Sequence, residues 1–129
     1  MANATLKATF SISSSNLFDT ISIAKTVTNS LTINGDNRQG LTTMVTSTSY
    51  ADINVEALSG TTAGGKKAYV YIKNPDTTND LIFADDGNQE FIRLAPGEFA
   101  FYPSADNTKI QVKSSAATPI VEFMLLEVD

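Results

Sequence analysis

The stretch Arg93-Leu-Ala-Pro-Gly-Glu-Phe-Ala-Phe-Tyr-Pro103 combines a tight turn with an apolar strand. Its Pro96-Gly97 pair suits a type II turn, because proline presets φ at the second position and glycine accepts positive φ at the third. The chain then restarts as a strand in which Phe99 and Phe101 share one face. We expect these two phenylalanines to pack against an opposing sheet.

Apolar and polar residues alternate with a period of two along most of the chain, as in residues 6–12 and 67–73. Asp85-Asp-Gly-Asn88 has the chemistry of a hairpin turn, and Asn34-Gly-Asp-Asn37 predicts a second turn. No segment shows a convincing helical period. The pattern therefore predicts an all-β fold, a single antiparallel β-sandwich that is jelly-roll-like or Ig-like, with about nine or ten short strands.

The last predicted strand, residues 120–128, is apolar on both faces apart from Glu122 and Glu127. A strand of an ordinary antiparallel sandwich has one face in water. Residues 120–128 are therefore a central strand, or a strand whose second face is covered by a neighbouring subunit. A helix is a weaker alternative because the segment is short and follows Pro119.

Composition narrows the classes of function. The 129 residues include no cysteine and no histidine, which removes thiolate metal sites, Ser-His-Asp triads and Cys-His pairs. The net charge of −5 disfavours a nucleic-acid partner, and no apolar run reaches the length of a membrane span. We therefore expect a protein that is not an enzyme, has no cofactor and binds neither nucleic acid nor membrane.

Serine and threonine are concentrated in the first half of the chain, with 21 among the first 62 residues and 7 among the remaining 67. The shift occurs at Ser59-Gly-Thr-Thr-Ala-Gly-Gly65, a loop by composition. About 60 such residues would bury little core alone. We therefore predict one domain over residues 1–129, with residues 1–20 as a candidate N-terminal arm.

One group of acidic side chains is a candidate Ca²⁺ site because carboxylate and amide oxygens lie close together around a glycine. The spacing does not match an EF-hand loop, and a solvated hairpin turn is the favoured alternative. The candidate ligands are Asp85, Asp86, Asn88 and Glu90.

Two other groups of side chains suggest weaker sites. Tyr69, Tyr71, Phe101 and Tyr102 could form an aromatic sugar-binding face, with core packing as the favoured alternative. Glu122 lies within an apolar run, where a raised pKa is conceivable, but a carboxylate paired with a lysine at an edge or interface is favoured over a catalytic acid.

Three segments carry a resemblance to a known family. They are Tyr71-Ile-Lys-Asn74, Leu94-Ala-Pro-Gly-Glu98 before an aromatic strand, and Glu122-Phe-Met-Leu-Leu126 near the C-terminus. In this order they resemble small structural proteins of tailed bacteriophages, especially phages of aquatic bacteria. The resemblance covers residues 67–129, and the N-terminal half is similar only in its Ser/Thr-rich strands and the Gly40-Leu41 pair.

The resemblance implies a virion protein on the outer capsid surface, most specifically a decoration or cement protein. Its implied partners are the major capsid protein and other copies of the chain, in a homo-oligomer that is commonly a trimer in this family. A carbohydrate- or receptor-binding module of a tail or fibre is the alternative, and the exact position in the particle stays open. The candidate interface residues are Leu17, Phe18, Ile120, Phe123, Met124 and Leu126.

Overall fold

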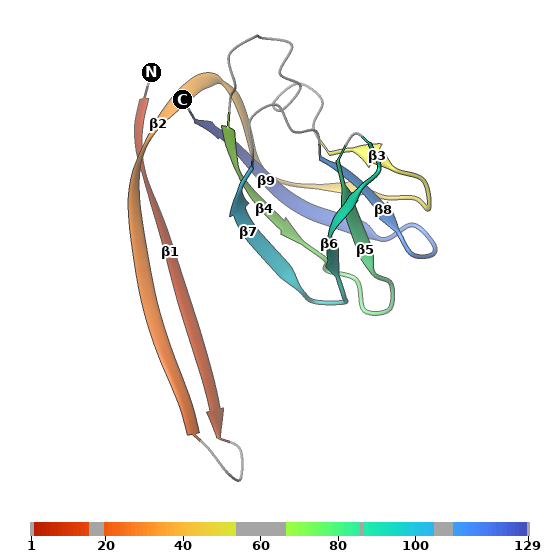
Figure 1. The fold of residues 1–129 in the computed structure, drawn as a ribbon, viewed down its shortest axis with the longest axis horizontal. Coiled ribbons are helices and arrows are strands. Elements are labelled where there is room, and N and C mark those ends of the chain that lie inside the picture. Colours follow the sequence, from red (N-terminus) through yellow and green to blue (C-terminus); the bar gives the residue numbers. More distant parts are fainter. Residues whose placement is uncertain (1, 16–19, 54–66, 86, 105–109, 129) are drawn as a thin grey trace. The chain divides into compact units, whose positions relative to one another are not determined.

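The computed structural model describes residues 2–15, 20–53, 67–85, 87–104 and 110–128. These residues form antiparallel sheets and no helix, which confirms the predicted all-β class (Figure 1). The chain divides into two compact units, residues 1–33 and 34–129, where the sequence predicted one domain with an arm of 1–20. The separate unit ends at residue 33 because the first part of the second strand pairs with the first strand.

Nine strands occur in the described residues. The first two are long, so the prediction of short strands holds only for the other seven. The strands are β1 (Ala2–Ser15), β2 (Thr20–Val45), β3 (Ala51–Asp52), β4 (Lys67–Lys73), β5 (Leu81–Ala84), β6 (Glu90–Leu94), β7 (Phe99–Pro103), β8 (Gln111–Ser114) and β9 (Ile120–Val128). The turn predicted at residues 34–37 is wrong, because β2 continues through it.

The strand order identifies the topology of residues 34–129 as a jelly roll. One sheet has the order β1-β2-β9-β4-β7 and the other has the order β3-β8-β5-β6. In the eight strands from β2 to β9, the neighbours are nested: β2 lies beside β9, β3 beside β8, β4 beside β7 and β5 beside β6. This nested pairing is that of a long hairpin rolled into two sheets, and it selects the jelly roll over the Ig-like alternative.

The hydrophobic core draws on both sheets of residues 34–129. Its largest fully buried apolar side chains are Phe83, Ile72, Leu81, Ile110, Leu125, Val70, Val112 and Val121. β9 lies between β2 and β4, so the prediction of a central C-terminal strand is confirmed.

The prediction for β7 is wrong in its sidedness. Ala100 and Tyr102 pack against the core, whereas Phe99 is exposed and Phe101 is only half-buried. Tyr102 pairs in register with the fully buried Val70 of β4, so its side of β7 is the core side.

The turn at residues 95–98 forms as predicted. The Glu98 amide donates to the Ala95 carbonyl at 3.0 Å, and Gly97 has a φ of 81°, in the left-handed region that glycine tolerates. The Glu98 side chain also accepts a hydrogen bond from the Ala95 amide at 2.8 Å. The turn is therefore closed by one backbone and one side-chain hydrogen bond.

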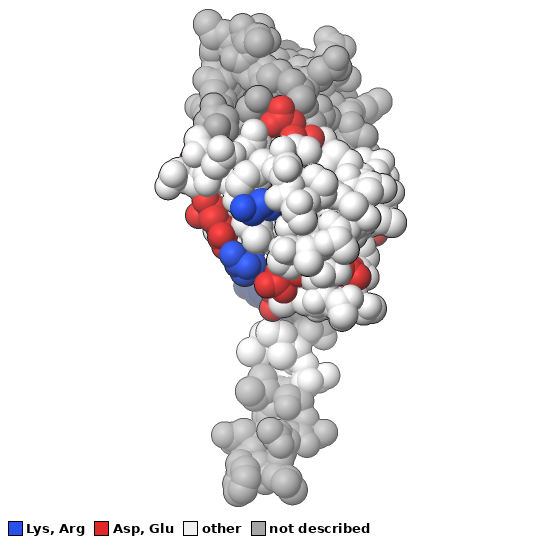
Figure 2. Space-filling view, turned by 90° about the vertical axis from the view of Figure 1, so that its right-hand side faces the viewer, with Lys and Arg blue, Asp and Glu red and all other residues white. Residues whose placement is uncertain are grey.

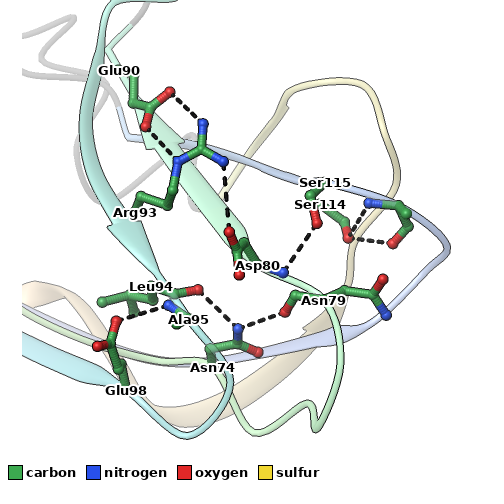
Figure 3. A network of polar contacts seen from close by, with 11 residues as sticks. Asn74, Asn79, Asp80, Glu90, Arg93, Leu94, Ala95, Glu98, Ser114 and Ser115 are labelled. Atoms are coloured by element: carbon green, nitrogen blue, oxygen red, sulfur yellow. Dashed lines mark hydrogen bonds and ion pairs between the residues drawn. The ribbon is translucent and has the colours of Figure 1, made fainter.

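Asn74 ties this turn to the loop after β4 (Figure 3). Its backbone amide donates to the Glu98 carbonyl at 2.9 Å, and its carbonyl accepts from the Gly97 amide at 2.8 Å. Its fully buried side chain donates from Nδ2 to the carbonyls of Asn79 and Leu94, at 2.8 and 2.9 Å. The buried side chain bonds both the loop after β4 and the end of β6, while the Asn74 backbone bonds the turn, so Asn74 fixes how the two loops meet.

The N-terminal unit is a β-hairpin. β1 pairs with residues 20–33 of β2 in an unbroken antiparallel register that runs from Ala2 opposite Ile33 to Ser15 opposite Thr20. Residues directly opposite one another share a face of the hairpin, so the even-numbered residues of β1 lie with the odd-numbered residues of β2.

Candidate interaction surface

The solvent side of strands β9, β4 and β7 is unusually apolar. Residues alternate along β4, so that Ala68, Val70 and Ile72 are fully buried while Tyr69 and Tyr71 face outward. The strand register places the outward-facing residues of β9, β4 and β7 side by side, in rows that cross the three strands. Tyr69 lies between Leu126 and Pro103, Tyr71 between Met124 and Phe101, and Lys73 between Glu122 and Phe99.

Exposed apolar residues enlarge this surface at both sides. Phe99 is 62% exposed on β7, and Ile120 is 46% exposed on β9. On β2, which neighbours β9, Leu41 and Val45 are exposed while Met44 packs against the core. The outer sheet face is defined here as Leu41, Val45, Tyr69, Tyr71, Phe99, Phe101, Ile120, Met124 and Leu126.

Aromatic contacts and one polar contact order the middle of the outer sheet face. The rings of Tyr69 and Phe101 stack with centroids 5.7 Å apart and planes 14° from parallel. The Tyr71 hydroxyl donates to Glu122 Oε1 at 3.0 Å. Partial burial, followed by this hydrogen bond and the charge of Glu122, raises the pKa of Tyr71 above its ordinary value of 10.0. Glu122 therefore acts as the hydrogen-bond acceptor of a tyrosine.

The interface residues predicted from sequence fall into three groups. Ile120, Met124 and Leu126 lie on the outer sheet face. Phe123 does not, because it is 4% exposed and belongs to the core. Leu17 and Phe18 lie outside the described residues.

The outer sheet face also holds three of the four residues of the predicted aromatic sugar-binding face. Tyr69, Tyr71 and Phe101 belong to it. Tyr102 packs against the core instead, and its ring makes a T-shaped contact with Phe91, with centroids 6.2 Å apart. Sequence reasoning missed Phe99, Leu41 and Val45 as surface residues. The sequence does not mark them as surface residues, because an apolar residue in an alternating strand can lie on either face until the pairing of distant strands is known.

Tyr102 has a buried hydroxyl with no hydrogen-bond partner among the described residues. An unpaired buried hydroxyl costs about 1–3 kcal/mol, so Tyr102→Phe should stabilise the fold by about 1 kcal/mol in urea unfolding at neutral pH. Destabilisation by Tyr102→Phe would mean that the hydroxyl has a partner.

The same residue should affect stability in alkali. Burial raises the pKa of Tyr102 above its ordinary value of 10.0. Because the unfolded chain loses this proton first, the contribution to stability is present below pH 10 and is lost as the pH rises further. Tyr102→Phe should therefore lose less stability above pH 10 than the natural chain does. Equal losses in the two chains would contradict a raised pKa of Tyr102 in the folded chain.

Two residues of the candidate Ca²⁺ site, Asp85 and Asn88, lie in a hairpin turn. Asp85 Oδ1 accepts hydrogen bonds from the amides of Gly87 and Gln89 at 2.9 and 2.8 Å. Asn88 adopts a positive φ of 59°, as such a turn requires.

Glu90 has a separate role, because it binds Arg93 through both carboxylate oxygens, at 2.9 and 3.1 Å. Asp86 lies outside the described residues. No group of three acidic, histidine or cysteine side chains with metal-binding geometry occurs in the part of the chain that the structure describes.

Charged groups are scattered over the face drawn in Figure 2 and form no basic cluster among the residues coloured there. No helix in the described ranges is long and apolar enough to cross a membrane. No family model, curated protein or solved structure matches the chain.

Proposed function

We propose that this chain is a structural protein of a virion that decorates or cements the outer capsid shell, with the major capsid protein as its partner. The observation that carries the proposal is the outer sheet face. Nine apolar or aromatic residues from four strands are gathered on one side of a sheet, and the charged residues in the described rows of β4, β7 and β9 on that side are Lys67, Lys73 and Glu122.

Such a face supports a role that depends on burial between proteins. Contiguous apolar patches of this kind on soluble proteins mark sites of interaction. Each decoration contact that forms only on the assembled shell stabilises that shell by mass action. The aromatic and methionine content of the face also matches the residue types that are enriched at protein interfaces.

The topology and the resemblance support the same class. Jelly rolls occur in viral capsid proteins, although also in lectins and cupins, so the fold alone does not decide the function. The segments that resemble phage structural proteins contribute Tyr71, Met124 and Leu126 to the outer sheet face.

The proposal is tested on particles of the phage or host that encodes the chain. Antibodies raised against the purified chain are used for immunogold electron microscopy of concentrated particles. Regularly spaced gold on the heads is expected. Gold confined to tails, or unlabelled particles in a preparation shown to contain the chain, would contradict a decoration role.

The surface itself is tested by binding to heads stripped of the chain. Met124→Lys places a charge in the middle of the outer sheet face and should weaken binding at least about 100-fold. Thr77→Lys adds the same charge in the exposed loop between β4 and β5 and should bind as the natural chain does. Equal binding by both variants would exclude this face as the contact.

A carbohydrate-binding role is the second candidate, because the stacked Tyr69 and Phe101 rings and Tyr71 lie together on the exposed face. Aromatic side chains are the usual platform for sugar rings. Binding on a glycan array that is lost on Tyr69→Ala would favour this role. Absence of glycan binding together with gold on the heads would exclude it.

A further inference from the structure

The N-terminal hairpin has two chemically different faces. On one face, Leu6, Ala8, Phe10 and Ile12 of β1 lie beside Ile23 and Val27 of β2. The described residues of the other face are serines and threonines, with Lys7 and Ala24 as the exceptions. We call the first of these the hairpin face.

The hairpin face is open to solvent. No described side chain of residues 5–13 or 22–30 is buried. Phe10, Ile12, Ile23 and Val27 are all exposed, and Ile12 is 56% exposed. A two-stranded hairpin is marginally stable in water at best, since an isolated hairpin has no other element to cover its apolar face. An apolar cover is therefore required whenever the hairpin is folded.

We propose that the hairpin of a second copy of this chain covers the hairpin face. The cover must be available wherever the chain is folded. A second copy of the chain satisfies this condition. The contact is separate from the outer sheet face, so it specifies a self-association surface beyond the proposed binding to a capsid.

The hairpin face is complementary to itself. A twofold axis parallel to the strands lays β1 of one copy over β2 of the other and keeps each row in place. Lys25, the one charged residue among the described residues of the face, shares a row with Phe10. In this arrangement, each Lys25 lies over the partner's Phe10, a cation–π contact, and no two lysines meet.

The area suits a modest dimer. The 14 register pairs span about 45 Å, and two strands are about 10 Å wide, so that each face covers about 450 Å². Two such faces bury about 900 Å², at the low end for specific complexes, and a dissociation constant in the micromolar range is expected.

Sedimentation of the full chain up to about 500 μM tests the proposal, since this range covers a micromolar dissociation constant. The natural chain should show concentration-dependent association. Ile12→Lys, on the hairpin face, should weaken it at least about 10-fold, whereas Ser11→Lys, one residue away on the polar face, should not. A natural chain that stays monomeric, or association that survives Ile12→Lys, would overturn the proposal.

Cross-linking gives a readout that does not depend on destabilising the hairpin. The chain has no cysteine, so single cysteines report only on introduced positions. Ala8→Cys and Val27→Cys copies, mixed in equal amounts, should form a heterodimeric disulfide under mild oxidation. Thr9→Cys and Thr26→Cys, an equivalent row on the polar face, should not. Equal cross-linking of both mixtures would contradict the face-to-face contact.

The two proposals can fail independently. Met124→Lys leaves the hairpin unchanged and should still self-associate. Loss of self-association in Met124→Lys, with Ile12→Lys unaffected, would instead assign the outer sheet face as the self-contact.

Discussion

Phe123→Ala should lose about 3–5 kcal/mol of unfolding free energy, whereas Met124→Ala should lose less than about 1 kcal/mol. The two residues are adjacent on β9 and point to opposite sides of the sheet. Phe123 lies in the core opposite the fully buried Ile72. Met124 lies opposite Tyr71 on the outer sheet face, where truncation leaves no internal cavity. Urea unfolding followed by circular dichroism measures both losses.

The pair also separates folding from function. Met124→Lys should remain folded with a stability close to that of Met124→Ala, while the proposed binding to capsid heads should be weakened at least about 100-fold. If Met124→Ala were as damaging as Phe123→Ala, the outward side of β9 would be packed within the chain, and the outer sheet face could not be a free surface. If Phe123→Ala cost little, the register of β9 against β4 would be wrong.

The sequence predicts the strands of residues 67–128 closely. β4 and β9 have the bounds that their alternation and flanking prolines indicate, and the hairpin of β5 with β6 forms around the turn at Asp85. These features are local, since turn chemistry and a period of two depend only on neighbouring residues. The strand order that makes the jelly roll depends on contacts between distant strands, and the pattern left two folds open.

The sidedness of β7 could not be predicted, because both of its faces are apolar. Phe99 and Phe101 form the larger pair, and size favoured them for the core. The core instead takes Ala100 and Tyr102, since these lie beside the buried side of β4. Alternation identifies the buried face of a strand only where the other face is polar.

The length of β2 shows the opposite failure, in which a strong local signal is overridden. Residues 34–37 have the composition of a turn, but the strand continues through them. On one side of this segment, residues 20–33 of β2 pair with β1, and on the other side β2 lies beside β9. Strand pairing on both sides overrides the local turn signal. The boundary between the two units nevertheless falls at residues 33 and 34, next to the predicted turn.

Only the part of the outer sheet face that lies on β9 could be predicted, because the sequence pattern describes single strands and not their order in the sheet. The apolar excess of residues 120–128 indicated a strand that is central or covered by a neighbouring subunit, and Ile120, Met124 and Leu126 lie on the outer sheet face. Their neighbours on that face come from strands distant in sequence. Leu41, Phe99 and Tyr69 are brought together only by the order β2-β9-β4-β7.

Asn74→Ala should destabilise the fold by about 2–4 kcal/mol, the largest effect expected for any polar residue described here. Its buried side chain donates to the carbonyls of Asn79 and Leu94 and accepts from the Asp76 amide at 3.1 Å. Alanine leaves all three backbone groups without this partner, and the carbonyl of Leu94 is in a buried hydrogen bond. Urea unfolding at neutral pH measures the loss.

Asn74→Asp provides an isosteric control that isolates the two donated hydrogen bonds. The new carboxylate keeps the acceptor for Asp76 but faces two carbonyl oxygens, so its pKa in the folded chain should lie above its ordinary value. The stability of this variant relative to the natural chain should then rise as the pH falls from about 7 to about 4, because a protonated carboxyl group can donate again. If the deficit were the same at both pH values, or if Asn74→Ala cost less than about 0.5 kcal/mol, Asn74 would not be the residue that joins the turn at residues 95–98 to the loop after β4.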